Sequence, residues 1–228
     1  MTKRGRLIVF EGADGSGKTT QSKLLVNYLN NPPAGGKIPN AYVSFPRYED
    51  SMWGQMVKRY LMGEFGKLDE VDPYFGSLPY AGDRMTAADE LKRWLNDGKI
   101  VVANRYIGSN IGHMAAKFSD IKSQDKYIKW LEDLEYRENG IPKEDLVLFL
   151  HVPVEVSKKL MRGRHLDIHE RDLRYLEKVI RVYERVASER KNWETIACTS
   201  GGKILPAAEI HQRVLEVLKR CGILRIKK

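Results

Sequence analysis

The sequence is poor in cysteine and contains no long apolar segment. Only Cys198 and Cys221 occur among its 228 residues, and their spacing matches no metal-binding motif. We expect both to be reduced thiols of a protein that works in the cytoplasm. No apolar run approaches the roughly 20 residues that cross a bilayer. The run Leu7–Phe10, which follows a basic N-terminus, is too short for a signal sequence, so we expect no membrane association.

Internal repeats, coiled-coil heptads and low-complexity tracts are also missing from the sequence. Hydrophobic residues make up 42% and charged residues 30% of the chain, which is a globular composition and not a disordered or fibrous one. The Pro- and Gly-rich stretch at residues 31–40 is short enough to be a loop within one domain. We predict a single domain over residues 1–228 with a full hydrophobic core.

Basic residues outnumber acidic ones, and the formal net charge is +9. Such an excess is compatible with nucleic-acid binding and also with a surface that attracts small anionic substrates. The basic residues are scattered, and only Arg225–Lys228 forms a dense run. This distribution favours small anions, so we expect no nucleic-acid partner.

Short runs of branched apolar residues alternate with longer stretches that have helical spacing. The short runs are typical of buried parallel strands, at Leu7–Phe10, Ala41–Phe45, Ile100–Ala103, Leu146–Leu150 and Thr195–Ala197. The alternation predicts an α/β fold, in which helices flank both sides of a five-stranded parallel sheet. Right-handed crossovers then bring the carboxyl ends of all strands to one edge, where ligands bind.

The clearest motif is a glycine-rich phosphate-binding loop. Residues Gly12-Ala13-Asp14-Gly15-Ser16-Gly17-Lys18-Thr19 fit the pattern G-x-x-x-x-G-K-[ST] between an expected strand and an amphipathic helix. The glycines let backbone N–H groups surround an anion, and the helix points its positive end at the same place. Lys18 supplies a charge for the outer phosphates, and the Thr19 hydroxyl can bind Mg²⁺. We predict that these residues and Thr20 bind ATP.

Two large classes of P-loop protein do not fit this chain. Signalling GTPases would need a guanine-reading Asn-Lys-x-Asp segment, which is absent, and large motor ATPases would need a longer chain. The class of P-loop protein that remains is a small phosphotransferase. The predicted architecture is therefore a three-layer P-loop NTPase fold.

The sequence also resembles a known family. The segment from Phe10-Glu11-Gly12 to Thr19 is similar to the opening of thymidylate kinases. Four further segments agree in order and spacing: Ser44-Phe45-Pro46-Arg47, Tyr80-Ala81-Gly82-Asp83-Arg84, Asn104-Arg105-Tyr106 with Ser109-Asn110, and Arg162-Gly163-Arg164 with Asp167 and Glu170. The resemblance covers nearly the whole chain. Each outer motif is modest alone, but the ordered set is specific.

The resemblance implies a site for a phosphorylated acceptor, thymidylate. Arg105 directly ends an expected strand and is implied to bind the acceptor phosphate. Arg47 is implied to grip the same phosphate, although its residue type also allows an ordinary surface arginine. Asp14 is implied to approach the sugar hydroxyl and the metal, or else to shape the loop. His113 is implied to lie beside the sugar.

The thymine base is implied to lie against residues of two further motifs. Tyr80 is implied to stack on the ring, although the residue alone is equally compatible with core packing. Arg84, at i+4 from Tyr80 on a helix, shares its face and is implied to contact the base edge. Asn110 offers a donor and an acceptor to that edge. The expected acceptor-binding residues are Asp14, Phe45, Arg47, Tyr80, Arg84, Arg105, Ser109, Asn110 and His113.

Phosphoryl transfer depends on charge neutralisation more than on covalent chemistry. Some thymidylate kinases carry a basic residue in the P-loop where this chain has Gly15. A further cation is therefore expected from Arg162 or Arg164, in a mobile lid at about residues 162–172, unless these arginines form a solvated helix end. The expected catalytic residues are Lys18, Arg105, Arg162 and Arg164, and the expected Mg²⁺ ligands are Thr19 and Asp14.

The chain departs from the family pattern at three positions. Asn104 stands where many members have an Asp that organises Mg²⁺, so metal organisation is expected to depend more on Thr19 and Asp14. His113 replaces a Tyr or Phe and can titrate, but we assign it no catalytic role. Pro79 precedes Tyr80 and is expected to kink or start the helix that carries it.

The resemblance implies transfer of the γ-phosphoryl group of ATP to dTMP, which gives dTDP and ADP for dTTP biosynthesis. Mg²⁺ is the implied cofactor, and a homodimer is the implied assembly. Two alternatives remain open: a deoxynucleoside kinase, which would bind an uncharged acceptor, and a nucleotide-dependent regulatory ATPase.

Overall fold

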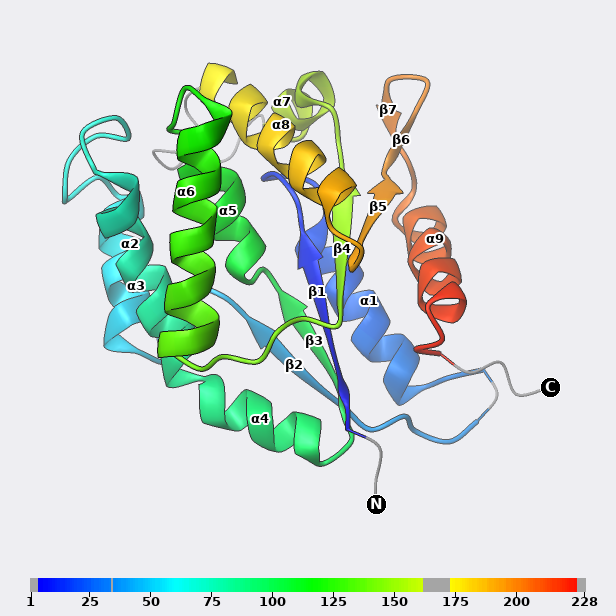
Figure 1. Ribbon diagram of the computed structural model, residues 1–228. Coiled ribbons are helices and arrows are strands. Elements are labelled where there is room, and N and C mark those ends of the chain that lie inside the picture. The colour runs from blue at the N-terminus through cyan, green and yellow to red at the C-terminus, as the bar shows by residue number, and fades with distance from the viewer. Residues whose placement is uncertain (1–3, 34, 162–172, 225–228) are drawn as a thin grey trace.

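The computed structural model describes residues 4–33, 35–161 and 173–224. The lid expected at about residues 162–172, with Arg162 and Arg164, lies outside the described residues. The described chain forms a parallel sheet of five strands with helices on both faces (Figure 1). The predicted α/β fold with a five-stranded parallel sheet is therefore confirmed.

The strand order in the sheet is β2-β3-β1-β4-β5. All five strands begin and end within two residues of the predicted positions: β1 (Arg6–Glu11), β2 (Asn40–Ser44), β3 (Ile100–Asn104), β4 (Leu146–His151) and β5 (Trp193–Ala197). The central strands β1, β3 and β4 are buried along almost their whole length, as their continuous apolar runs predict, whereas the edge strands β2 and β5 are only partly buried.

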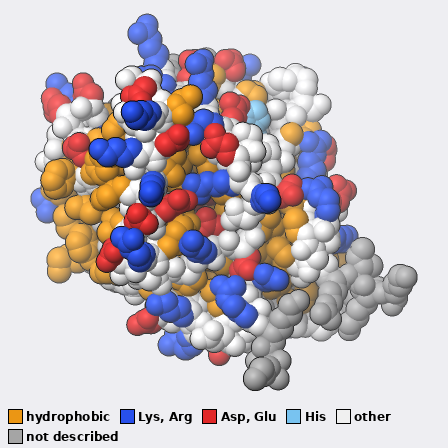
Figure 2. Space-filling model, viewed as in Figure 1, with side chains coloured by type: hydrophobic (Ala, Val, Ile, Leu, Met, Phe, Trp, Pro, Cys, Tyr) orange, Lys and Arg blue, Asp and Glu red, His pale blue; other side chains and the backbone are white. Residues whose placement is uncertain are grey.

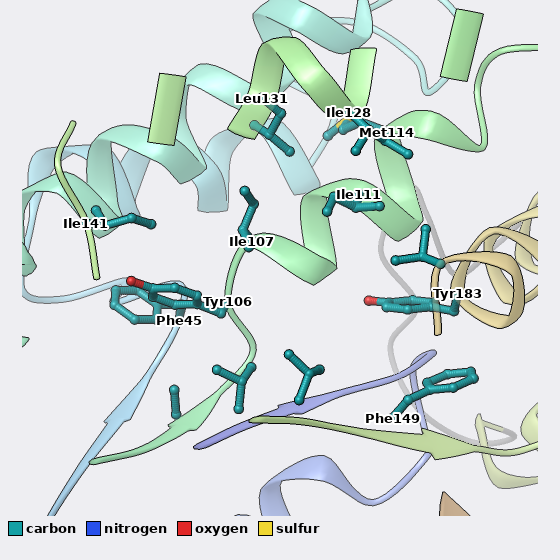
Figure 3. Packing of buried hydrophobic residues seen from close by; sticks show 14 of the residues in the cluster. Phe45, Tyr106, Ile107, Ile111, Met114, Ile128, Leu131, Ile141, Phe149 and Tyr183 are labelled. Atoms are coloured by element: carbon teal, nitrogen blue, oxygen red, sulfur yellow. The ribbon is translucent and has the colours of Figure 1, made fainter. Parts of the chain in front are cut away.

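Side chains of the central strand β1 alternate between two hydrophobic clusters, as the period of a strand requires. Leu7 and Val9 face one cluster, and Ile8 and Phe10 face the other. The first cluster lies under helices α4 (Ala88–Asn96), α5 (Ile107–Ala115), α6 (Ile121–Glu132) and α8 (Leu173–Glu189). Figure 3 shows side chains of α5 and α6 that pack there above Phe149 of β4.

The opposite face of the sheet is covered by α1 (Lys18–Asn30) and α9 (Ala207–Arg220) (Figure 1). Helix α7 (Val154–Met161) and a short antiparallel hairpin, β6 (Thr199–Ser200) and β7 (Lys203–Ile204), complete this side. Among the residues described, no helix combines the length and the apolar character that a membrane span needs.

Helices α2 (Met52–Leu61) and α3 (Pro73–Thr86) pack against each other beside α5 and α6 (Figure 1). Pro79 lies inside α3, so the expectation that it starts this helix is wrong. The helix begins at Pro73, where the side chain of Asp72 accepts a hydrogen bond from the N–H of Tyr74 at 2.8 Å. Proline at the first helical position after an Asp cap is a strong start signal, and it precedes Pro79 in the chain.

The parallel pairing of β1 with β3 places two functional segments next to each other. In their register Phe10 lies opposite Asn104, and the N–H of Arg105 continues the pairing by donating to the carbonyl of Phe10 at 3.0 Å. The P-loop after β1 and the turn after β3 therefore leave the sheet side by side. This is the switch point of the strand order, where α/β proteins bind ligands.

The contact between α5 and α8 gives a test of the packing. A methyl group at Gly112 would overlap the buried ring of Tyr183, whereas one at Gly76 would lie 3.4 Å from the flexible end of Met114 and 3.6 Å from the Tyr60 hydroxyl. We expect Gly112→Ala to lower the free energy of unfolding by about 1–3 kcal/mol. The matched variant Gly76→Ala should leave it unchanged or raise it by up to roughly 1 kcal/mol. Urea titration checks both, and equal effects would contradict the described packing.

Candidate active site

The P-loop joins the end of β1 to the start of α1. Gly17 occupies the cap position of α1 with a φ of 90°, and no side chain caps the helix. At Gly12, with a φ of 145°, an added methyl group would lie 2.7 Å from the carbonyl oxygen of Leu150. Only glycine fits these two positions. The uncapped N–H groups at the start of α1 are the groups that bind phosphate in such loops.

Lys18 lies buried over the same loop. Its ammonium group donates to the carbonyl oxygens of Gly12 at 2.9 Å and Ala13 at 2.8 Å, and it lies 3.8 Å from the carboxylate of Asp14. The loop thus positions a cation on the side where α1 presents its positive end. Both features favour an anion at this place.

The Thr19 hydroxyl has a partner at the end of β3. The amide nitrogen of Asn104 donates to Thr19 Oγ1 at 3.2 Å and to Ser44 Oγ at 2.9 Å. The amide oxygen of Asn104 is buried and accepts no hydrogen bond from any described residue. Mg²⁺ at nucleotide sites takes one or two protein oxygens and completes its shell with phosphate and water. Thr19 and the neutral oxygen of Asn104 fit such a site.

The described chain contains no cluster of three or more His, Cys, Asp or Glu side chains that could hold a metal by itself. Asp14, the other expected ligand, directs its carboxylate to Arg105, with which it forms an ion pair. Its role at Mg²⁺ therefore stays a prediction.

A pocket opens beside the P-loop, between α3, α5 and the loop after β2. Its empty space, including the part open to solvent, is about 550 Å³. It is lined by Asp14, Phe45, Pro46, Tyr48, Leu61, Tyr80, Arg84, Arg105, Tyr106, Ser109, Asn110, His113 and Met114. Eight of the nine residues expected to bind the acceptor are among them, and Arg47 is not.

Arg105 stands at the end of the pocket nearest the P-loop. Its φ of 67° is in the left-handed region, which is unusual for a residue with a side chain and costs about 1 kcal/mol. Its guanidinium group ion-pairs with Asp14 and donates to Ser109 Oγ at 3.3 Å. His113 lies beside Asp14 in the same pocket. Burial lowers the pKa of His113 to about 4, so its imidazole is neutral at pH 7. A strained backbone that aims an arginine at a phosphate site is typical of active sites.

Arg84 also lines the pocket and is almost fully buried. It donates through Nε to Glu135 Oε1 at 2.9 Å and through Nη2 to the same oxygen. It also donates to the side-chain oxygen of Asn110 at 3.1 Å and to the carbonyl of Tyr106 at 3.3 Å. Tyr80 lines the pocket half-buried, with its ring edge-on to Tyr60 at 6.2 Å. Its position is compatible with both core packing and base stacking.

Arg47 does not line the pocket, although its guanidinium carbon lies 5.8 Å from the ring centre of Phe45, which does. Its Nε lies 3.3 Å from Asp83 Oδ1, and Nη2 donates to the carbonyl of Asp83 at 3.0 Å and to Thr86 Oγ1. Asp83 also accepts from the Ser51 hydroxyl at 2.7 Å. Asp83 therefore fixes the loop after β2 to α3, and contact between Arg47 and an acceptor phosphate stays a prediction.

Sequence reasoning gave no role to Glu11, which proves central to the site. This carboxylate is fully buried; it accepts from the N–H groups of Tyr106 at 2.7 Å and Ser109 at 3.0 Å, and from Ser109 Oγ at 2.7 Å. Burial raises the pKa of Glu11, and these hydrogen bonds and Arg105 oppose the rise. Glu11 on β1 thus caps α5, whose own N-cap residue makes no capping hydrogen bond with its side chain. A charged residue between a buried strand and a P-loop was the available signal.

The fold and the phosphate cradle, with a second pocket that opens on the same loop, define a P-loop phosphotransferase. A family model described as thymidylate kinase matches residues 10–205. The chain therefore belongs to the thymidylate kinase family and is a kinase.

Known relatives agree with this assignment. The chain is 30% identical over 184 residues to a thymidylate kinase of Dictyostelium discoideum, which covers 81% of this chain and 74% of that protein. It is 29% identical over 190 residues to a thymidylate kinase of Mycobacterium tuberculosis, which covers 80% and 86% of the two chains. The solved structure of a thymidylate kinase from Candida albicans superposes with a TM-score of 0.78 at 22% identity, over 99% of this chain and 96% of that one.

The cap that Glu11 provides can be tested by substitution. Glu11→Ala removes the acceptor of the N–H of Tyr106 and of the Ser109 hydroxyl, and it leaves the N–H of Ser109 with the carbonyl of Tyr106 at 3.2 Å alone. We expect it to lower the free energy of unfolding by about 2–4 kcal/mol. Glu11→Gln keeps an oxygen for these donors and should cost about 1 kcal/mol or less. Urea unfolding measures both changes. A Glu11→Ala variant as stable as the wild type would show that the cap contributes nothing.

Proposed function

We propose that the protein transfers the γ-phosphoryl group of ATP to dTMP and forms dTDP and ADP, a step toward dTTP. The observation that carries this proposal is the contact between Asp14 of the P-loop and Arg105 of the pocket. It makes the two phosphate sites neighbours, and direct phosphoryl transfer requires that the donor and acceptor phosphates meet.

Each end of the reaction has residues suited to it. The N–H groups of the P-loop and Lys18 would hold the outer phosphates of ATP, and Lys18 would exchange its loop carbonyls for phosphate oxygens. Arg105 would hold the acceptor phosphate with a charge that persists at any physiological pH. Arg84 would face the base, and Tyr80 would lie against it.

We further propose that Thr19, with Asn104 beside it, holds Mg²⁺ together with the nucleotide. When bound, the ion neutralises charge on the β- and γ-phosphates. Because Asn104 lacks the charge of an aspartate, the site depends on the phosphates for most of its negative charge. A further cation would come from Arg162 or Arg164. We place the reaction in the cytoplasm.

A panel of acceptors tests the substrate. With ATP and Mg²⁺ we expect dTMP to give the highest kcat/KM among dTMP, dUMP, dCMP, dAMP and thymidine. Lys18→Met should fold normally and lower kcat by about 10²-fold or more, because one cation at the transferred group is lost. Preference for thymidine would favour a deoxynucleoside kinase. ATP hydrolysis that ignores every acceptor would favour a regulatory ATPase, and either result would overturn the proposal.

We also propose that the enzyme is a homodimer. Support comes from apolar side chains that are exposed on α2, on α3 and on the loop between them: Met52 at 78%, Met62 at 69%, Phe65 at 43%, Phe75 at 71%, Leu78 at 37% and Met85 at 42% exposure. Figure 2 shows orange side chains gathered on the side where Figure 1 places these helices. An apolar surface of this kind marks a protein interface more often than a free surface.

A charge on this surface should separate the subunits. Phe75→Asp places a carboxylate within the apolar patch, and we expect it to shift the molecular mass in light scattering from that of a dimer to that of a monomer. The matched variant Ile204→Asp, on the distant hairpin, has a side chain that is 37% exposed and should leave the mass unchanged. A monomeric wild type would contradict the assembly.

A further inference from the structure

Glu135 is a fully buried carboxylate that the proposed reaction does not use directly. It lies in η1 (Asp133–Glu138), a π-helical segment that continues α6 without a break. The N–H of Asn139 donates to the carbonyl of Leu134 at 2.8 Å, across the wider turn of such a helix. π-Helical turns cost stability and recur at functional sites. Burial raises the pKa of Glu135, and the charge of Arg84 opposes this rise.

The position of Glu135 on its helix is that of a core residue. Tyr127, Leu131 and Glu135 follow each other at intervals of four residues, and each is 0% exposed. The stripe faces α3, which carries Arg84 and Tyr80. A carboxylate in place of an apolar residue at this point requires a compensating partner. Arg84 is that partner, through the Nε contact at 2.9 Å and the second contact from Nη2.

The contacts with Glu135 determine where the rest of Arg84 points. With Nε and one Nη2 hydrogen directed at Glu135, the other Nη2 hydrogen donates to Asn110 Oδ1 at 3.1 Å. Nη1 donates to the carbonyl of Tyr106 at 3.3 Å, which uses one of its two hydrogens. The other Nη1 hydrogen has no acceptor among the described residues, and since Arg84 lines the pocket, this hydrogen is a donor available to a bound base, as is the buried amide nitrogen of Asn110.

We propose that Glu135 is a positioning residue that sets base specificity by holding the guanidinium group of Arg84 as a fixed, charge-compensated donor in the lining of the acceptor pocket. The inference rests on the proposed function. A guanidinium group can only donate, so a fixed one favours a base with a carbonyl oxygen at its edge. It rejects a base that presents an amino group there, because two donors would face each other unpaired. The 4-oxo pyrimidines, thymine and uracil, satisfy this rule, and cytosine does not.

The test compares dTMP with dCMP in Glu135→Gln. Glutamine keeps the size of the side chain and one oxygen for the two contacts, but it leaves the charge of Arg84 uncompensated and replaces two charge-assisted hydrogen bonds by weaker neutral ones, so the guanidinium group is held less firmly. We expect KM for dTMP to rise about tenfold, the kcat/KM ratio of dTMP to dCMP to fall about tenfold, and KM for ATP to stay within about twofold. A purely structural role would lower kcat with the amount of folded enzyme and leave the KM and the ratio unchanged.

Glu144→Gln is the matched control. Glu144 is another buried carboxylate shortly after η1 in the chain, hydrogen-bonded to Tyr136 at 2.7 Å and absent from the pocket lining. Its loss should lower stability without changing the ratio of dTMP to dCMP. An unchanged ratio in Glu135→Gln, or an equal fall in Glu144→Gln, would overturn the proposal. If the wild type did not prefer dTMP at all, the proposed function would fail first, and the two failures are thus distinguishable.

A measurement on the wild type covers the case in which Glu135→Gln does not fold. The Nε–H signal of Arg84 in ¹⁵N NMR, assigned from its loss in Arg84→Lys, should exchange slowly with water because Nε donates to a buried carboxylate. The signal of Arg59, whose side chain is 57% exposed, provides the fast reference. Exchange of Arg84 at the rate of Arg59 would show that Glu135 does not hold it.

Discussion

One buried carboxylate holds the two halves of the site together. Glu11 ends β1, yet its side chain caps α5, which follows β3. The same carboxylate therefore ties the P-loop to the turn that carries Arg105. An uncompensated carboxylate could not remain in this position, since burial opposes its charge. The backbone donors at the start of α5 stabilise that charge, and Gly108 keeps the space above it open, since a methyl group there would lie 2.9 Å from the Glu11 side chain.

The remaining charges of the site follow the same rule. Asp14 compensates Arg105, Glu135 compensates Arg84, and Asp83 compensates Arg47. Arg105 and Arg84 are each held in the pocket lining by a carboxylate from another element of the fold, so these donors are directed before any nucleotide arrives, whereas Asp83 holds Arg47 outside the pocket lining. Such preorganisation is the main way in which kinases stabilise the transferring group, because little covalent chemistry is left for the protein. The pairs differ in burial: Arg84 with Glu135 is nearly solvent-free, whereas Arg105 with Asp14 is partly open.

The sequence was sufficient for the strands, the P-loop and most of the pocket lining, and insufficient for the pairing of charges. Buried strands and the spacing of Gly12 to Thr19 are local patterns, so they can be recognised without tertiary structure. The partner of a buried arginine is not local: Arg84 and Glu135 are 51 residues apart in the chain. The stripe of Tyr127, Leu131 and Glu135 would have marked Glu135 as buried, but only the packing of η1 on α3 identifies its partner.

A crystal structure with dTMP and a non-hydrolysable ATP analogue would test the central claim, that Glu11 places two phosphate sites beside each other. We expect the acceptor phosphate on Arg105, the γ-phosphate next to it on Lys18 and the P-loop, and the thymine ring beside Arg84. A thymine ring bound at the P-loop end, or an acceptor phosphate far from Arg105, would contradict the claim.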